Sequence, residues 1–371
     1  MFKRLHGGSS PASIEERDGQ VDELYRSGCE ALEREAYVEA GRHARRALAL
    51  DPSLPSLHYL LGLALFDMGD FAGAVGALDA CLERGPQYPL ASHAQAKSAL
   101  ARTRLNPEHD PPRERSASAA PHVSVIVCSV TPAKFERVSA NYGALLAGLE
   151  HEIIGIHDAR SLSEGYNRGI RRARGEVLVF SHDDIEIHSP DFSAKLANRM
   201  AEFDLIGTAG TDLVRGGTWV DSGWPHVFGQ IGMPAPIAGR ILVTNFVMRG
   251  ANAAPMQALD GVFLAARREV AERVGFDEQT FDRWHLYDLD FSYSAFRAGF
   301  KCAACNDLLI VHESPGNYDA LWHQHAKRFI TKHLGRPADD YVPVPLEVCT
   351  LEVASAREWR LFTHHMTRVR N

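Results

Sequence analysis

The stretch that most constrains the fold is Gly175 to Ile187, which reads Gly-Glu-Val-Leu-Val-Phe-Ser-His-Asp-Asp-Ile-Glu-Ile. Its apolar run, Val177 to Phe180, is long enough for a buried strand and too short for a helix. His182, Asp183 and Asp184 follow directly, at the strand end where open α/β sheets bind ligands. Side chains at i and i+2 project the same way, so His182 and Asp184 can converge on one divalent cation. A turn capped by aspartate is the alternative that these residues leave open.

The composition suits a folded protein of two domains. The chain has 371 residues, of which 45% are hydrophobic, so a sizeable core is expected. The net charge of −7 argues against nucleic acid as a partner, because phosphate binding needs a basic surface. No apolar run approaches the ~18 residues of a transmembrane segment. The N-terminus lacks the apolar core of a signal peptide, and six scattered cysteines suit reduced thiols, so a cytoplasmic location is expected.

The Cys302 and Cys305 pair has the CxxC spacing of a metal site. It falls in Phe300 to Cys305, which is predicted to be a strand. Residues at i and i+3 of a strand point to opposite faces, and no second cysteine pair completes a zinc site. Both cysteines are therefore predicted to be core residues.

The segment from residue 21 to 105 is helical and repetitive. Gly28 and Gly62 are 34 residues apart, as are Ala40 and Ala74, and Asp51-Pro52 and Gly85-Pro86. This period resembles the tetratricopeptide repeat, in which small residues let paired helices approach closely. Two repeats and a final helix from Pro89 to Leu105 fall short of the usual minimum of about three repeats, so a partner surface is expected. A generic helical bundle is the alternative.

Composition also divides the rest of the chain. Residues 1 to 20 are predicted to be disordered, and 106 to 121 are rich in proline and charge and form a linker. A second domain covers residues 122 to 335, and 336 to 371 form a C-terminal extension.

The second domain begins with a β-α-β-α-β pattern. Strands are predicted at 122–130, 152–156 and 177–180, with helices at 134–149 and 161–174 between them. Ser161 and Glu164 have the spacing of a capping box, and Gly175 is predicted to close that helix. The fold class is therefore α/β, a parallel sheet with helices on both faces, preceded by an all-α domain.

The order of motifs resembles the family-2-type glycosyltransferases of the GT-A fold, in the branch whose metal motif is His-x-Asp. An Asn-x-Gly-Ile helix precedes the His182 cluster. After it come Asp260-Gly-Val-Phe, Gly275-Phe-Asp-Glu, Tyr287-Asp288-Leu-Asp290 and a strand that ends at His312. The resemblance covers about Val123 to Leu334. The sequence departs from it at Cys128-Ser129, where the family has Pro-Thr, and at His182 and Tyr287, where it has acids.

The resemblance implies a divalent metal, Mn²⁺ or Mg²⁺, and a nucleotide-sugar donor, which we expect to be a UDP-sugar. The metal ligands would be His182, Asp184 and His312; for His312, a structural histidine is the alternative. The donor would contact five residues: Ser129, Asp158, Asn167, Arg168 and Asp183. An ordinary solvated helix face is the alternative for Asn167 and Arg168.

Inverting transfer also needs a general base, and the resemblance assigns it to Asp288. Asp290 lies about 200° further round a helix, so only one of the two carboxylates is expected to reach the cleft. A plain helix N-cap is the alternative for Asp288. The acceptor would contact Asp260, Trp284 and His285.

Two further segments carry predictions. The glycine-rich stretch 215–240 is expected to be a long loop that acts as a lid or acceptor loop. The basic, amphipathic stretch 357–370 is expected to pack on the domain, with a peripheral contact to a membrane surface as the alternative.

These features predict a metal-dependent glycosyltransferase acting on a glycan or protein acceptor. The repeats are expected to recruit a protein or to self-associate. A non-enzymatic interaction protein with a degenerate transferase domain is the rival class. A metal-dependent nucleotidyltransferase ranks last, because Val130 to Lys134 is a poor triphosphate loop.

Overall fold

The computed structural model describes residues 11–107, 111–248, 250–337, 341–344, 346 and 348–368, with side chains from Glu16 onward. The chain divides into two compact units, residues 1–108 and 109–371. Within the described ranges, every helix is too short or too polar to cross a membrane.

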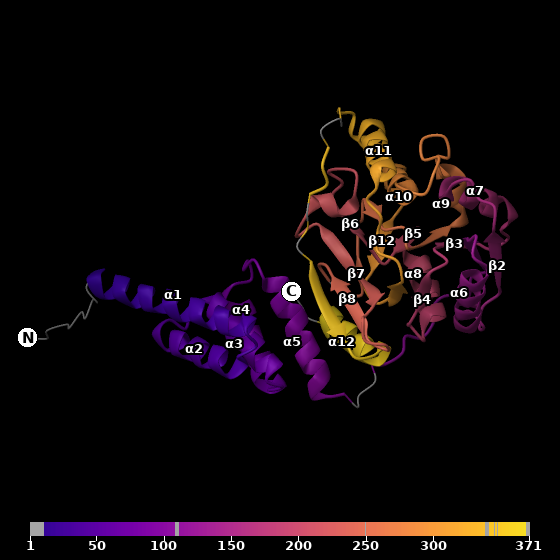
Figure 1. The fold of residues 1–371 in the computed structure, drawn as a ribbon. Helices are drawn as coiled ribbons and strands as arrows, with labels where there is room; N and C mark the ends of the chain where they lie inside the picture. The colour runs from indigo at the N-terminus through magenta and orange to yellow at the C-terminus, as the bar shows by residue number, and fades with distance from the viewer. Residues whose placement is uncertain are drawn as a thin grey trace, which may run out of the picture. The chain divides into compact units, whose positions relative to one another are not determined.

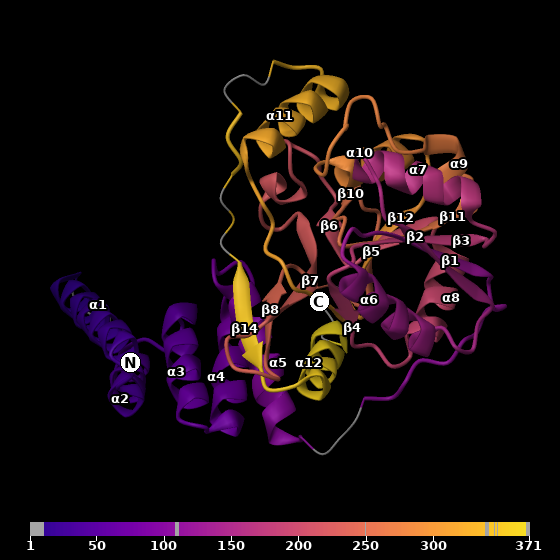
Figure 2. The ribbon, with the colours of Figure 1, turned by 45° about the vertical axis from the view of Figure 1, so that its right-hand side comes forward.

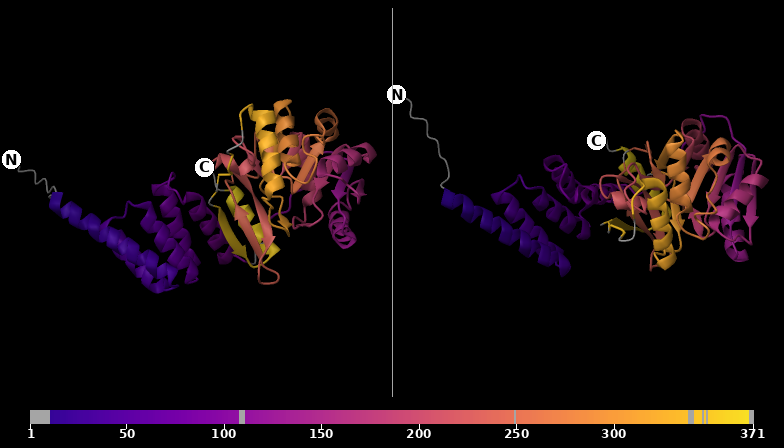
Figure 3. Two further views of the ribbon diagram at one scale, coloured as in Figure 1. Left: turned by 45° about the horizontal axis from the view of Figure 1, so that its top comes forward. Right: turned by 90° about the horizontal axis from the view of Figure 1, so that it is seen from above.

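The described part of the first unit is a row of helices in which each contacts the next (Figures 1 and 3). They are α1 (Pro11–Glu33), α2 (Tyr37–Leu50), α3 (Pro55–Asp67), α4 (Phe71–Arg84) and α5 (Ala91–Leu105). A Cβ atom at Gly28 would lie 2.6 Å from the Leu60 side chain, and one at Gly62 would lie 2.5 Å from Leu78. The predicted close approach of helices at the repeated glycines is thus confirmed.

Helix α1 begins earlier than the sequence predicted. It includes residues 11–20, for which disorder was expected. A helix that already packs from Val21 onward can extend backward at little cost, because each added residue gains one hydrogen bond. The remaining residues of that segment lie outside the described part of the chain.

The second unit is built on two mixed sheets (Figure 1). The first has the order β2-β1-β3-β11-β5-β12-β9, and the second has the order β10-β6-β7-β13-β4 with β8 and β14 added. The strands of the first sheet are β1 (Val123–Cys128), β2 (His151–Ile156), β3 (Val177–Ser181), β5 (Leu205–Gly207), β9 (Asn252–Ala253), β11 (Phe263–Arg267) and β12 (Cys302–Cys305).

The three strands predicted from the β-α-β-α-β pattern are parallel, as expected, with β1 between β2 and β3. The sheet as a whole is not parallel, however. Strand β11 runs antiparallel to both β3 and β5, and β9 runs antiparallel to β12. Each antiparallel pair joins strands that are far apart in the sequence, whereas the sequence pattern covered only the first three strands.

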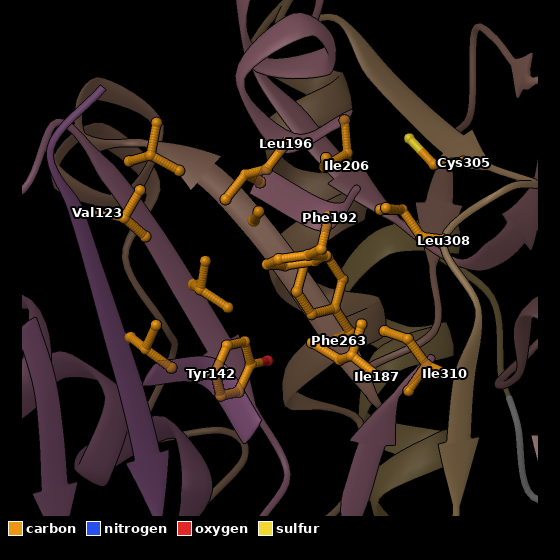
Figure 4. Close-up of a cluster of buried hydrophobic side chains, with 14 of the residues drawn as sticks. Val123, Tyr142, Ile187, Phe192, Leu196, Ile206, Phe263, Cys305, Leu308 and Ile310 are labelled. Atoms are coloured by element: carbon orange, nitrogen blue, oxygen red, sulfur yellow. The ribbon is translucent and has the colours of Figure 1, made fainter. Parts of the chain in front are cut away.

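Helices cover both faces of the first sheet. On one face, α6 (Pro132–Leu145) and α8 (Phe192–Glu202) pack against Val125 and Val179, and Figure 4 shows Tyr142, Phe192 and Phe263 meeting in this core. On the other face lie α7 (Leu162–Arg172), α9 (Arg268–Val274) and α10 (Tyr287–Arg297). Cys305 belongs to the first core and Cys302 to the second, so the prediction of opposite faces is confirmed.

The second sheet contains residues 227–234 of the stretch that was expected to be a lid loop. Its strands are β4 (Ile185–Ile187), β6 (Ala209–Thr211), β7 (Val227–Pro234), β8 (Ile241–Asn245), β10 (Ala258–Leu259), β13 (Ile310–His312) and β14 (Cys349–Val353). The loop prediction was wrong for residues 227–234. Glycine marks close contacts there: Gly229 has φ +105°, and a Cβ at Gly232 would lie 2.5 Å from Trp359.

The amphipathic C-terminal helix α12 (Ala356–Arg368) packs on the second sheet, as predicted. Trp359 and Phe362 are fully buried, and Trp359 Nε1 donates a hydrogen bond to Gln230 Oε1 at 2.7 Å. Figure 2 shows α12 beside β8 and β14. Its apolar face is therefore covered by protein.

Two local predictions need correction. Ala173 and not Gly175 is the C-cap of α7; Gly175 is needed because a Cβ there would lie 2.6 Å from the Ser124 nitrogen. The predicted capping box is only half formed. The N-cap residue Ser161 accepts a hydrogen bond from the Glu164 nitrogen at 3.0 Å, as predicted. Glu164 Oε2, however, accepts from the backbone nitrogen of Arg160, one residue before the N-cap, and not from that of Ser161.

Part of the predicted linker belongs to the second unit. Glu114 accepts hydrogen bonds from both terminal nitrogens of Arg199 on α8, at 2.8 and 3.0 Å. The backbone nitrogen of Ala117 donates to Asn198 Oδ1 at 2.8 Å. Residues 114–117 are therefore attached to the second unit by polar contacts.

Candidate functional site

Three of the predicted residues meet at one point. His182 follows β3, Asp184 precedes β4, and His312 ends β13, whose antiparallel pairing sets His312 opposite Ile185. His312 Nε2 lies 3.2 Å from both His182 Nδ1 and Asp184 Oδ1, and His182 Nδ1 lies 3.9 Å from Asp184 Oδ1. Three ligand atoms from two chain segments, within 4.8 Å of one another, have the arrangement of a metal site.

The charges of this cluster suit a divalent cation. Burial alone would raise the pKa of Asp184, but hydrogen bonds from His312 and Ser314 outweigh it and hold the pKa well below its usual range. Burial and the neighbouring His312 lower the pKa of His182 to about 4. At neutral pH the cluster thus offers one carboxylate and a neutral His182. Nitrogen and oxygen donors together fit Mn²⁺ better than Mg²⁺.

Two side chains that the sequence did not assign to the site support Asp184. Ser314 Oγ donates a hydrogen bond to Asp184 Oδ2 at 2.7 Å, and Lys134 Nζ lies 3.5 Å from the same oxygen. Ser314 stands two residues after His312, and this i, i+2 spacing is a signal that could have identified it. Lys134 comes from α6, and no local pattern links it to Asp184.

The predicted base, Asp288, stands in the first turn of α10. The N-cap of this helix is Leu286, in a left-handed conformation with φ +62°, so the alternative that Asp288 is the N-cap was wrong. Burial, and then the negative charge of Asp260, raise the pKa of Asp288 to about 7; backbone N–H groups at the helix start and at Gly261 oppose this rise. A carboxylate with a pKa near neutrality is matched to proton transfer at pH 7.

Asp290 points elsewhere, as the helical spacing predicted. It is 2% exposed, and its Oδ1 accepts from Lys332 Nζ at 2.7 Å and His333 Nε2 at 2.6 Å. Lys332 and His333 belong to the single-turn segment η2 (Ile330–Leu334). Asp290 therefore anchors α10, while Asp288 faces the cleft.

A cleft of about 950 Å³ joins these groups. His182, His312 and Asp288 line it, together with the three predicted acceptor residues, Asp260, Trp284 and His285. Aromatic side chains form much of its wall: Trp219, Phe246, Trp284, Tyr287, Tyr318 and Trp322. Among the described residues that line this cleft, the charged or titratable groups are aspartates, histidines and tyrosines.

The acceptor residues differ in how firmly they are held. Asp260 accepts hydrogen bonds from Trp219 Nε1 and the Val262 nitrogen, each at 3.0 Å, so its carboxylate is fixed at the cleft wall. Trp284 is 45% exposed and free to stack on a ligand. His285 Nε2 lies 3.5 Å from Asp319 Oδ1, and burial lowers its pKa.

Four of the five predicted donor residues form two pairs. Ser129 Oγ, beyond the end of β1, donates to Asp183 Oδ2 at 2.6 Å. Arg168 of α7 forms an ion pair with Asp158 at 2.9 Å, beyond the end of β2. Both pairs lie at the carboxyl ends of parallel strands, where such sheets bind ligands.

Asn167 is occupied by a structural contact. Its Nδ2 donates to the Phe276 oxygen at 2.8 Å, and its Oδ1 accepts from the Phe276 nitrogen at 3.0 Å. This carboxamide connects α7 to the segment after α9, and because its partner is 109 residues away in the sequence, no local pattern indicates the contact.

Comparison with known proteins agrees with this arrangement. A family model described as a glycosyltransferase-like family matches residues 124–333, and a tetratricopeptide-repeat model matches residues 31–98. No curated protein matches the chain.

Several solved structures are similar to parts of the chain. A mannosyltransferase from Pyrobaculum calidifontis, solved with GDP-Man and Mn²⁺, is 14% identical; the match covers 79% of this chain and 81% of that one, with a TM-score of 0.35. GalNAc-T7, solved with UDP, GalNAc and Mn²⁺, is 14% identical over 57% of this chain and 48% of its own, with a TM-score of 0.33. The N-terminal domain of stress-induced protein-1 from C. elegans is 22% identical over 24% of this chain and 73% of its own, with a TM-score of 0.23.

The family match runs from the first strand of the α/β unit to η2 and contains both carboxylates among the described residues that line the cleft, Asp260 and Asp288, although part of the lining, within residues 342–348, lies beyond it. Since the matched residues, 124–333, are more than half of the 371, the chain belongs to the glycosyltransferase-like family.

Proposed function

We propose that the protein is a metal-dependent, inverting glycosyltransferase that moves a sugar from a UDP-sugar to a glycan or protein acceptor. The observation that carries the proposal is the convergence of His182, Asp184 and His312 beside a cleft that also contains Asp288. One side of the site can hold a cation with a diphosphate, and the other can accept a proton.

A divalent cation held by His182, Asp184 and His312 would neutralise the charge that develops on the diphosphate leaving group. The protein supplies the remaining functions. The Ser129–Asp183 and Asp158–Arg168 pairs offer hydrogen-bond acceptors for the ribose or base and a guanidinium for phosphate.

Asp288 would take the proton from the acceptor hydroxyl as the new glycosidic bond forms. Its pKa of about 7 means that about half of the carboxyl groups are ionised at neutral pH and ready to accept that proton. Asp260, whose carboxylate accepts a hydrogen bond from Trp219 Nε1, places a second negative charge beside Asp288. This carboxylate can also bind an acceptor hydroxyl.

The cleft favours an acceptor without phosphate groups. Its described lining has aspartates and histidines but no lysine or arginine, so a phosphorylated acceptor would meet like charges. Exposed aromatic rings such as Trp284 and Tyr318, which are 45% and 55% exposed, can stack on the apolar face of a sugar. A neutral glycan, or a hydroxyl on a polypeptide, fits this chemistry.

The test is donor turnover and its dependence on metal. The full chain is incubated with a panel of UDP- and GDP-sugars, with and without Mn²⁺, and both binding of the donor and release of the nucleotide are measured. We expect slow hydrolysis of one or more UDP-sugars, abolished by EDTA and by Asp184→Ala. If no nucleotide binds with or without Mn²⁺, the transferase proposal is wrong, and the rival interaction protein with a degenerate domain takes its place.

The helical repeats add a second expectation, that they recruit a protein acceptor or partner. Repeat arrays present extended surfaces that commonly bind peptides, and a tethered partner is held at high effective concentration. Self-association is the alternative, and deletion of the repeats distinguishes the two.

A further inference from the structure

The phenol of Tyr287 bridges a proposed metal ligand and the protein backbone. Its oxygen lies 2.7 Å from His182 Nε2 and 3.0 Å from the carbonyl oxygen of Gly261. A carbonyl oxygen can only accept a hydrogen bond, so the single phenol proton is donated to Gly261. The phenol oxygen must then accept from His182, which requires a proton on His182 Nε2.

That requirement also determines the protonation of the other ring nitrogen of His182. A neutral imidazole carries one N–H, so a proton on Nε2 leaves Nδ1 with a free lone pair. Nδ1 is the atom that faces His312 Nε2 at 3.2 Å and Asp184 Oδ1 at 3.9 Å. In the opposite tautomer an N–H would point into the cluster, and the lone pair would point at the phenol.

We propose that Tyr287 is a positioning residue that holds His182 in the tautomer whose Nδ1 can bind the cation. This role rests on the metal site of the proposed function. The nitrogen of a ligand histidine that does not bind the metal usually donates its proton to a carboxylate, a backbone carbonyl or water, which sets both the tautomer and the ring orientation. Here the acceptor is a phenol 105 residues away in the sequence.

The surrounding structure keeps the hydroxyl in place. Tyr287 is 4% exposed, and its ring centroid lies 5.6 Å from that of Tyr166 and 6.3 Å from that of Phe276. A Cβ at Gly261 would lie 2.4 Å from the Tyr287 hydroxyl, so only glycine allows this contact. The left-handed Leu286 directs the chain into α10 immediately before Tyr287.

Tyr287→Phe removes the hydroxyl and keeps the ring. In the full chain without nucleotide, we expect Mn²⁺ affinity, measured by electron paramagnetic resonance of free Mn²⁺, to fall by about 10- to 100-fold. In the metal-free protein, long-range ¹H–¹⁵N spectra should show His182 protonated at Nε2 in the wild type, with that preference lost in the variant. The His182 signal is assigned from its loss in His182→Asn.

Tyr293→Phe is the matched control. Tyr293 lies on the same helix, and its ring packs against Phe296 and Phe329 at 6.3 and 6.0 Å. This variant should keep wild-type Mn²⁺ affinity and the His182 tautomer. Thermal unfolding of both variants reports on any general loss of structure.

Three results would overturn the role of Tyr287 alone: equal Mn²⁺ affinity in wild type and Tyr287→Phe, an equal loss in Tyr293→Phe, or a wild-type His182 protonated at Nδ1. A wild-type protein that binds no Mn²⁺ would overturn the metal site and this role together. Because neither measurement uses a sugar nucleotide, a failure to find the donor is a separate outcome.

Discussion

Asp288→Asn should abolish sugar transfer and, at the same time, stabilise the protein at alkaline pH. Asparagine has nearly the shape of a protonated aspartate, so the change removes the charge and the proton acceptor with little change in packing. Donor binding should persist, because the residues proposed to bind it lie at the ends of β1, β2 and β3 and on α7.

The size of the stabilisation follows from the pKa of Asp288, which burial and Asp260 raise from 3.8 to about 7. At about 1.4 kcal/mol per pH unit, ionising this carboxyl costs the folded state at most about 4 kcal/mol. Because the pKa is raised on folding, the stability that this group contributes is complete below pH 4 and is lost as the pH rises to about 7. The advantage of Asp288→Asn should therefore grow by about 3 kcal/mol between pH 5 and pH 9.

Urea unfolding at pH 5 and pH 9, followed by tryptophan fluorescence, measures this difference. All five tryptophans lie beyond residue 200, so the signal reports on the second unit without contribution from the helical repeats. In the same buffers, the transfer rate of the wild type should rise with pH through about 7 and then level off.

Asp290→Asn provides a control of opposite sign on the same helix. It replaces the charged acceptor of the hydrogen bonds from Lys332 and His333 with a neutral carboxamide, so it should destabilise the protein by about 2 kcal/mol. A stability advantage for Asp288→Asn that stays constant from pH 5 to pH 9 would refute the raised pKa. Normal transfer by this variant would refute the assignment of the base.

Three further changes test other parts of the site. Asp184→Ala should abolish Mn²⁺ binding while circular dichroism and the cooperative unfolding of the domain are retained. Gly261→Ala should lower kcat by about 100-fold, because the new Cβ would meet the Tyr287 hydroxyl at 2.4 Å and Asp288 Cβ at 2.6 Å and displace both; a kcat near that of the wild type would contradict this. Deletion of residues 1–110, which leaves Glu114 bound to Arg199, should preserve donor hydrolysis and weaken transfer to a natural protein acceptor. A change from dimer to monomer in light scattering would instead indicate self-association through the repeats, and unchanged transfer with an unchanged number of chains per particle would contradict both roles.

The sequence by itself determined the local elements and the order of the motifs. A four-residue apolar run specified β3, and the i, i+3 spacing placed Cys302 and Cys305 on opposite faces of β12. The 34-residue period located the helical repeats. These features depend on backbone periodicity, which is the same wherever the element lies in the fold.

The direction in which the helical aspartates point also followed from periodicity. The 100° turn per residue separated Asp288 from Asp290, and the structure places them on different sides of α10, one at the cleft and one against Lys332. The same rule could not decide which of the two faces the cleft. That assignment came from the resemblance to a family.

Only the tertiary structure decided the contacts between distant segments. Residues 227–234, which were predicted to be a loop, form the strand β7 in the structure. The glycines of that stretch are needed because they allow close approach to Thr208 and Trp359. The tertiary structure also paired Asn167 with Phe276 and brought Ser314 to Asp184. Each of these contacts joins residues about 20 to 130 positions apart, over which periodicity carries no information.

The electrostatic properties of the site were also decided only by the tertiary structure. The raised pKa of Asp288 requires burial and the charge of Asp260, 28 positions earlier, and the orientation of His182 depends on Tyr287, 105 positions later. A pKa and a tautomer are set by the solvent and dipoles within a few ångströms of a group. The sequence could name these residues, but only their packing could determine their protonation.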